Sequence, residues 1–252
     1  MSNDFINPDK NGFKSRLLDE YLALGYYRMR NKLFTTHEVF VEYYGNSAVY
    51  TPVFWIRTII GKLEESVSSK RIRKKCIDFN VCVKAAEITE ETEELFSEYK
   101  KMINFETYDS LQDCMMENEA TINPFNSMMI EIRDRKELIA VGYFDIGETS
   151  SMAILNYYHP NYKKYSLGKF LLLKTLDYSK EQNMLYFYPG YISTTETKMD
   201  YKIFPAKNSI EVFLPIEKIW KPLLNYTKTD LHDYFFKRIL NIDFDENDLS
   251  EE

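Results

Sequence analysis

Two short segments hold the residue types best suited to binding a substrate. The first runs from Tyr158-His159-Pro160 to Ser166-Leu167-Gly168, where a strand is expected to end and a helix to begin. The free N–H groups and the positive dipole end of such a helix can hold a phosphate or an oxyanion. A purely structural role fits the same residues, because Ser166 can act as an N-cap and Gly168 can allow close packing.

The second segment is Tyr186–Tyr191, an aromatic strand interrupted by Pro189-Gly190. Proline removes a ladder hydrogen bond and glycine marks a bulge, so this segment is either an irregular sheet edge or a site where backbone groups are free for a substrate. Downstream, Lys198, Tyr201 and Lys202 are spaced as neighbours on a helix. That spacing alone is typical of a solvated face.

The elements around these segments predict an α+β fold with a GNAT-like acyltransferase core. Three strand-like runs with short polar turns between them indicate an antiparallel meander, at residues 127–133, 137–146 and 151–158. An apolar helix opening at Ser166-Leu167-Gly168 and a strand at 185–192 follow. A meander, a crossover helix and a parallel strand are the element order of the GNAT fold.

The N-terminal part shows a different pattern, which predicts a smaller α+β domain. We expect residues 13–30 to form a helix with a tyrosine-rich end, with Gly25 as its stop signal, and residues 39–57 to form a hairpin followed by a strand. The charge changes from the basic run 70–75 to the acidic run 87–98, and the tail 243–252 is acidic again. We therefore divide the chain into an N-terminal domain, 1–85, and a GNAT-like domain, 86–252.

Thr89 is a plausible N-cap for a helix with one apolar face. Glu90 and Glu91 in its first turn would favour the helix dipole.

Composition excludes several classes of protein. The chain has 252 residues with 32 Lys and Arg against 39 Asp and Glu, a formal charge of -7 that argues against a general nucleic-acid coat. Its three cysteines, Cys76, Cys82 and Cys114, fit neither a disulfide framework nor a four-ligand zinc site, which favours the reducing cytoplasm. No signal peptide is evident, and no apolar run reaches the ~20 residues of a membrane span.

Together the motifs resemble the arginyl-tRNA-protein transferase family. The resemblance rests on three segments in the family's order, which are Tyr165-Ser166-Leu167-Gly168, the tyrosine-rich strand ending in Gly190-Tyr191-Ile192, and Lys198-Met199-Asp200-Tyr201-Lys202. It covers residues 120–220 well and the N-terminal half more loosely, through Gly25-Tyr26-Tyr27-Arg28 among others. The family's cysteine cluster is absent, since residues 29–51 contain no cysteine. We therefore expect neither a metal nor another cofactor.

The resemblance implies transfer of an aminoacyl group, arginyl or leucyl, from a charged tRNA to the N-terminal amine of an acceptor protein, which marks that protein for degradation. Aminoacyl-tRNA and the acceptor N-terminus are then the partners, and no membrane partner is expected.

The resemblance assigns residues to three roles. Asp145 would orient the amine or relay its proton beside Tyr188 and Tyr191. The substrate-binding residues would be Arg28, Ser166, Leu167, Gly168, Gly190, Lys198, Tyr201 and Lys202, with Lys198, Lys202 and Arg28 facing an acidic acceptor side chain. The tRNA-binding residues would be Arg71, Arg73, Lys74 and Lys75.

Alternatives remain for individual residues and for the function of the whole chain. Asp145 could simply cap the turn after its strand, and the basic run 70–75 could be a solvated face. A CoA-dependent N-acetyltransferase would share the fold, although residues 162–168 lack the expected Gln/Arg-x-x-Gly-x-Gly/Ala pyrophosphate loop. A catalytically silent binding protein on the same fold is the third reading.

Overall fold

The computed structural model describes residues 4–45, 47–103, 107–117, 122–205 and 207–242, so the acidic tail 243–252 and Asn46 of the expected hairpin turn lie outside it. The strands are β1 (Asp4–Ile6), β2 (Tyr27–Met29), β3 (Lys32–Thr35), β4 (Glu38–Tyr44), β5 (Ser47–Ile59), β6 (Asn80–Ala85), β7 (Ser127–Asp134), β8 (Glu137–Ile146), β9 (Ser150–Tyr158), β10 (Tyr186–Ser193), β11 (Ile210–Leu214) and β12 (Ile219–Pro222). The α-helices are α1 (Arg16–Ala23), α2 (Val67–Lys75), α3 (Glu90–Lys100), α4 (Leu111–Met115), α5 (Leu167–Glu181) and α6 (Lys228–Tyr234). Short 3₁₀ segments are η1 (Ile60–Lys62), η2 (Pro160–Tyr165), η3 (Thr197–Ile203), η4 (Lys207–Ser209) and η5 (Leu223–Asn225), and a π-helical turn, η6 (Phe235–Ile239), follows α6.

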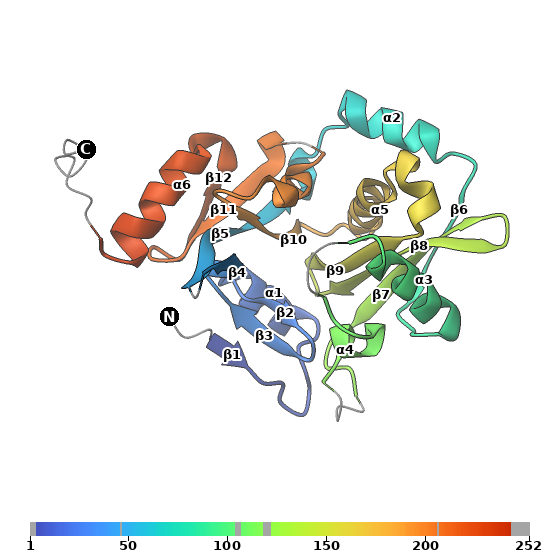
Figure 1. Cartoon of the computed structure of the whole chain (residues 1–252), viewed down its shortest axis with the longest axis horizontal. Helices are drawn as coiled ribbons and strands as arrows, with labels where there is room; N and C mark the ends of the chain where they lie inside the picture. The colour runs from blue at the N-terminus through green and yellow to red at the C-terminus, as the bar shows by residue number, and fades with distance from the viewer. Residues whose placement is uncertain (1–3, 46, 104–106, 118–121, 206, 243–252) are drawn as a thin grey trace.

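One large mixed sheet organises the chain, with the order β12-β11-β5-β10-β9-β8-β7-β6 and β4 paired to β5 (Figure 1). The strands β7, β8 and β9 form an antiparallel meander, α5 crosses over, and β10 returns parallel to β9. The predicted GNAT-like core is therefore confirmed. A separate three-stranded sheet, β1-β3-β2, is formed near the N-terminus.

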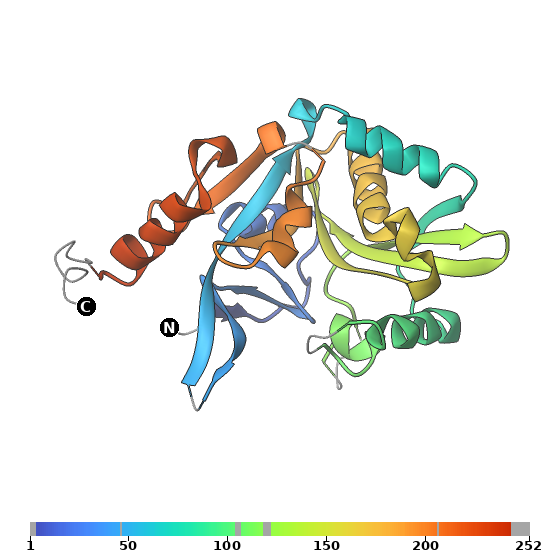
Figure 2. The same cartoon turned by 45° about the horizontal axis from the view of Figure 1, so that its top comes forward.

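Helices cover both faces of the meander, with α5 and α2 on one side and α3 and α4 on the other (Figures 1 and 2). The α5 side buries Phe144, Leu167 and Leu171 in one apolar cluster, whereas the α3 side buries Phe96 and Tyr157 in another. Because residues that alternate along a strand point to opposite faces, the meander strands are apolar on both faces. The meander is consequently enclosed as a central layer.

The helix expected after Thr89 is confirmed as α3. Thr89 caps it through a reciprocal pair of hydrogen bonds with Thr92, and Glu90 and Glu91 occupy its first turn.

The N-terminal prediction needs two corrections. Helix α1 covers only residues 16–23, and residues 27–29 form a strand rather than the end of a helix. Gly25 ends the helix with φ +81°, and a Cβ there would lie 2.4 Å from the Phe213 ring, so only glycine fits. The expected hairpin is confirmed as β4 and β5, but the strand expected after it is not separate, because β5 runs unbroken from Ser47 to Ile59. Strands on both sides of residue 85 share the large sheet, and the division into two domains stays a prediction.

Helix α1 is held on the turn between β8 and β9 by a single carboxylate. Asp19 accepts hydrogen bonds from the backbone N–H groups of Glu148 and Thr149, at 3.0 and 2.8 Å, and from the hydroxyls of Thr149 and Ser150. A Cβ on Gly147 would lie 2.0 Å from the Asp19 carboxylate. Glycine is therefore required at this turn for the carboxylate to approach the backbone.

Replacing Gly147 by alanine should lower the free energy of unfolding by about 1–3 kcal/mol, because the added methyl group displaces Asp19 from its donors. Urea denaturation followed by circular dichroism measures this change. Gly61→Ala is the matched control, since a Cβ at Gly61 would have no neighbour within 4 Å. Equal stability of the two variants would contradict the docking role of Asp19.

Candidate active site

The candidate site begins where β9 and β10 separate. The two strands pair in parallel at three positions, from Tyr186 opposite Ser150 to Tyr188 opposite Met152. Beyond this point β9 stays on β8, whereas β10 continues on β5 alone, from Gly190 opposite Ile56. The facing backbone groups of the two strands therefore have no ladder partner past Tyr188, and the strands part at the Pro-Gly step.

The predicted bulge in β10 is confirmed. The register of β10 on β5 shifts between Phe187 and Gly190, and Gly190 has φ +111°. A Cβ on Gly190 would lie 3.0 Å from the Lys202 ammonium nitrogen. Glycine thus allows both the backbone conformation and the close approach of a lysine side chain.

Tyr27 occupies the gap between the separating strands. Its hydroxyl lies against two carbonyl oxygens, those of Ala153 on β9 and Tyr188 on β10, the latter at 3.1 Å. Its ring stacks on Trp55 of β5 with 4.9 Å between centroids. Burial raises the pKa of Tyr27 well above its usual value, so the phenol stays protonated and remains a donor. Our sequence-based reasoning missed this residue, although it lies within the Gly25-Tyr26-Tyr27-Arg28 segment of the resemblance.

Lys202 from η3 lies on the bulge. Its ammonium group donates to the Tyr191 carbonyl oxygen at 3.1 Å and sits 4.5 Å from the centre of the Tyr191 ring. Among the described residues, no carboxylate forms an ion pair with it. Burial lowers the pKa of Lys202 to about 8. The structure therefore places a half-buried cation next to the free edge of β10.

Tyrosine rings connect this bulge to the start of α5. Tyr201 from η3 lies near Tyr191 and Tyr99, and burial together with these neighbours raises its pKa to about 12. Tyr99 from α3 contacts Tyr158 with 5.8 Å between ring centroids. A Cβ on Gly168 would in turn meet Tyr158 at 3.7 Å. The two segments singled out from the sequence are thus linked by one row of phenol rings.

The turn at the start of α5 is open rather than tightly packed. Ser166 has φ +59°, and its side chain makes no capping hydrogen bond, so the N-cap role does not account for the hydroxyl. A Cβ on Gly168 would meet only the Tyr158 ring, at an ordinary contact distance, so close packing does not require glycine there. Leu167 is fully buried beneath the turn. The first-turn N–H groups of a helix have no partner within the helix, which leaves this end able to receive an anion.

The structure pairs Arg28 with Asp145 inside the protein. Both side chains are fully buried, and the guanidinium donates to the two carboxylate oxygens at 2.8 and 2.9 Å. Ser127 also donates to Asp145, and Arg28 donates to the Met115 and Arg30 carbonyls. Burial raises the pKa of Asp145, whereas Arg28 and Ser127 lower it. These two predicted site residues thus bind each other and face no open cavity, and Asp145 makes none of the turn contacts of a cap.

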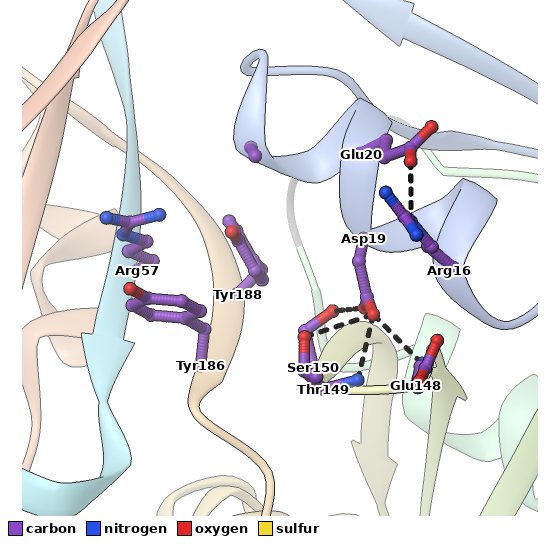
Figure 3. A pocket seen from close by; sticks show the side chains of 10 residues that line it. Arg16, Asp19, Glu20, Arg57, Glu148, Thr149, Ser150, Tyr186 and Tyr188 are labelled. Carbon is purple, nitrogen blue, oxygen red and sulfur yellow. Dashed lines mark hydrogen bonds and ion pairs between the residues drawn. The ribbon is translucent and has the colours of Figure 1, made fainter.

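Tyr188 shares a face of the sheet with Tyr191, because Tyr191 is paired with Trp55 of β5 and Tyr188 lies against Arg57, two residues further along that strand. It lines a pocket of about 440 Å³ beneath α1, together with Tyr186 and Arg57 (Figure 3). Arg57 is itself paired with Glu211, with 2.7 Å between nitrogen and oxygen. Burial raises the pKa of Tyr188 to about 12, so its phenol is neutral near pH 7. Tyr191 contacts Lys202 and lies near Tyr201, whereas Tyr188 lies against Arg57 and lines the pocket beneath α1.

The predicted tRNA-binding residues lie on α2, which packs on α5 (Figure 1). Arg71, Lys74 and Lys75 are exposed, whereas Arg73 binds Asp177 with both guanidinium nitrogens at 2.6 Å. Segment η2 adds two further exposed cations next to this helix end, because the Lys75 ammonium donates to the Lys164 carbonyl at 3.3 Å. We define the basic face as Arg71, Lys74, Lys75, Lys163 and Lys164.

Within the part of the chain that the structure describes, no group of three or more His, Cys, Asp or Glu side chains is arranged to hold a metal ion. No helix among the same residues has both the length and the apolar character needed to cross a bilayer.

Comparison with known proteins agrees with the motifs. Residues 91–206 match the family model described as "Arginine-tRNA-protein transferase, C terminus". An aspartate/glutamate leucyltransferase of Leptospira interrogans is 27% identical over 159 residues, 62% of each chain, and one of Teredinibacter turnerae is 30% identical over 146 residues, 55% of this chain and 59% of its own. The chain thus spans about three fifths of the length of these relatives.

Solved structures resemble the chain more weakly. A crystal structure of FemX is 10% identical, with a TM-score of 0.45, over 72% of this chain and 61% of that one. A GCN5-related N-acetyltransferase from Kribbella flavida is 12% identical, with a TM-score of 0.32, over 61% of this chain and 50% of that one.

Breaking the buried ion pair should destabilise the fold. Asp145→Asn or Arg28→Met leaves one charge buried without its partner, and each should lower the free energy of unfolding by about 3–5 kcal/mol. Removing both charges in Arg28→Met/Asp145→Leu should cost less than the sum of the single changes. Arg16→Met, which breaks an exposed pair with Glu20, is the control and should cost at most about 1 kcal/mol.

Chemical denaturation measures all four variants. A stable Asp145→Asn protein that had lost only its activity would instead place Asp145 in contact with substrate.

Proposed function

We propose that the chain transfers an aminoacyl group, leucyl or arginyl, from a charged tRNA to the N-terminal amine of an acceptor protein. The match of residues 91–206 to the C-terminal model of the arginine-tRNA-protein transferases and the distant homology to the aspartate/glutamate leucyltransferases support this proposal. The names of the relatives indicate that the acceptor begins with aspartate or glutamate. The product would be marked for degradation, and the reaction would take place in the cytoplasm.

The reaction needs alignment more than strong acid–base chemistry. The acceptor nitrogen attacks the ester carbonyl carbon, so a C–N bond forms, the bond to the ribose oxygen breaks, and the proton lost by the amine returns to that oxygen. An α-amino group has a pKa of about 7.7–8.0 and is partly neutral near pH 7. Holding amine and ester in line can supply up to ~7–11 kcal/mol of the barrier.

The separation of β9 and β10 at the Pro189-Gly190 bulge is the observation that carries this proposal. Past Tyr188 the strands present backbone groups without ladder partners, and such groups can bind the aminoacyl ester and its developing oxyanion. The open turn at Ser166 and Gly168 would face the aminoacyl end of the charged tRNA. Tyrosine side chains lie between this turn and the bulge.

Asp145 takes a different role from the one that the resemblance suggests. As part of a fully buried ion pair it is a positioning residue, which fixes Arg28 and the neighbouring Tyr27 against the gap. The proton relay assigned to Asp145 from the sequence has no support in this geometry. The amine and the leaving ribose oxygen can exchange the proton between themselves.

The basic face is proposed to bind the tRNA backbone. Its five exposed cations lie at the end of α2 and beside the start of α5, so phosphates bound there would lead the acceptor stem to the open turn. Phosphate contacts position a nucleic acid without reading its sequence. Arg73 contributes less to this surface, because Asp177 and Glu65 already neutralise it.

A transfer assay tests the proposed function. Purified protein, radiolabelled leucyl-tRNA or arginyl-tRNA and peptides beginning with aspartate should yield labelled peptide, whereas the same peptides with an acetylated N-terminus should not. Labelling from acetyl-CoA together with none from either charged tRNA would favour an N-acetyltransferase instead.

Neutralising the basic face should weaken tRNA binding without altering the fold. The variant Arg71→Gln/Lys74→Gln should reduce the slope of log affinity against log salt concentration by about 1–2, because each lost cation releases one counterion fewer. Lys221→Gln/Lys237→Gln is the charge-matched control, on β12 and η6 (Figure 1). Filter binding measures the slopes. Identical slopes for the two variants would show that the basic face is a solvated surface that does not bind tRNA.

A further inference from the structure

Lys202 is a half-buried cation whose hydrogen-bonding capacity is largely unused. An ammonium group has three N–H donors, and among the described residues it has one hydrogen-bond acceptor, the Tyr191 carbonyl oxygen at 3.1 Å. The acids on the same segment are occupied elsewhere, since Asp200 binds Lys228 at 2.9 Å and Glu196 lies 3.9 Å from Lys198. A cation held this far from water without a counterion is unfavourable unless a ligand supplies the negative charge.

The backbone is shaped to receive the Lys202 ammonium group at the bulge. A side chain on Gly190 would begin 3.0 Å from the ammonium nitrogen, and the Tyr191 ring lies beneath it at 4.5 Å. The ammonium group is thereby fixed beside the free edge of β10, where the acceptor amine must enter to reach the ester.

We propose that Lys202 is the specificity-determining residue of the acceptor site and binds the side-chain carboxylate of an acidic first residue. This inference rests on the proposed function, which brings an acceptor N-terminus to the bulge. A carboxylate bound to the Lys202 ammonium holds the adjacent α-amine at the gap between β9 and β10. The uncharged amides asparagine and glutamine cannot replace it, because they supply no counterion.

The other two cations predicted to bind the acceptor carboxylate, Arg28 and Lys198, are in less suitable surroundings. Arg28 already binds Asp145, and both side chains are fully buried. Lys198 is exposed to solvent, where an ion pair contributes little. Lys202 alone of the three combines burial with the absence, among the described residues, of a carboxylate partner.

The pH dependence follows from the same surroundings. The Tyr191 ring faces the Lys202 ammonium group, and Tyr201 is the preceding residue on η3. Burial raises the pKa of both phenols, so they are neutral near pH 8. Lys202 binds a carboxylate only in its charged form, which is lost as the pH rises above about 8. The acceptor amine becomes reactive over the same range as it loses its proton. For Asp-first acceptors kcat/KM should therefore pass through a maximum near this pH, whereas for Asn-first acceptors it should only rise.

The decisive variant is Lys202→Met, which retains the length and the apolar stem of the side chain. Transfer should be compared on peptides that differ only in Asp or Asn as the first residue. We expect kcat/KM for the Asp-first peptide to fall about 10- to 100-fold and that for the Asn-first peptide to stay unchanged. Lys202→Arg should restore part of the preference. Lys180→Met, at an exposed lysine near the end of α5, is the control and should leave kcat/KM for the Asp-first peptide unchanged. Equal losses on both peptides would make Lys202 a general base, and no loss on either would remove it from the site.

A binding readout separates this inference from the proposed function. Lysines with a lowered pKa react readily with amine-directed esters, and the extent of Lys202 modification can be read by mass spectrometry. An Asp-first peptide should protect Lys202, whereas an Asn-first peptide and inorganic phosphate should not. Protection without any transfer would overturn the proposed function and leave the carboxylate site intact. Protection by phosphate alone would assign Lys202 to the donor and overturn the inference.

Discussion

The early end of pairing between β9 and β10 is the constraint on which the rest of the site depends. Buried backbone groups need hydrogen-bond partners, and two strands that separate inside a sheet leave theirs unpaired. Tyr27 meets part of this need, because its hydroxyl contacts a carbonyl on each strand. The next residue, Arg28, is anchored by Asp145 on β8. The gap therefore exists only while the N-terminal sheet is docked, which ties residues far apart in the chain into one site.

Sequence patterns predicted the elements whose partners are close in the chain. The meander, α3 and α5 each carry a local signal, such as alternation, a cap or an apolar helical face. The position of β5 between β10 and β11 has no local sequence signal. An apolar run such as residues 53–56 predicts a buried strand but does not indicate which strands it pairs with. Helix α1 was predicted too long for a related reason, because Tyr27 and Arg28 fit a helix locally and become a strand only by pairing with β3.

The same limit applies to the candidate site. Residue type and resemblance pointed to Arg28, Asp145 and Lys202 alike, but they gave no information about burial. Arg28 and Asp145 are 117 residues apart and neutralise each other inside the protein. Lys202 has a similar side chain and no such partner among the described residues, which makes it the better candidate for binding a ligand. Only the three-dimensional arrangement distinguishes a structural charge from one left available.

The net charge of -7 conceals two electrostatic environments that suit the two proposed substrates. The basic face is exposed, and salt screens such charges beyond a Debye length of about 8 Å at physiological ionic strength. Attraction of the polyanionic tRNA is therefore long-ranged at low salt and reversible. Lys202 is half-buried on the Gly190 bulge, where salt screens its charge less. The position of its ammonium group therefore determines which carboxylate it can bind. A tRNA would thus be bound by several exposed charges, each contributing little, and the acceptor by the single charge of Lys202. The same protein can therefore release the spent tRNA and still select its acceptor by one carboxylate.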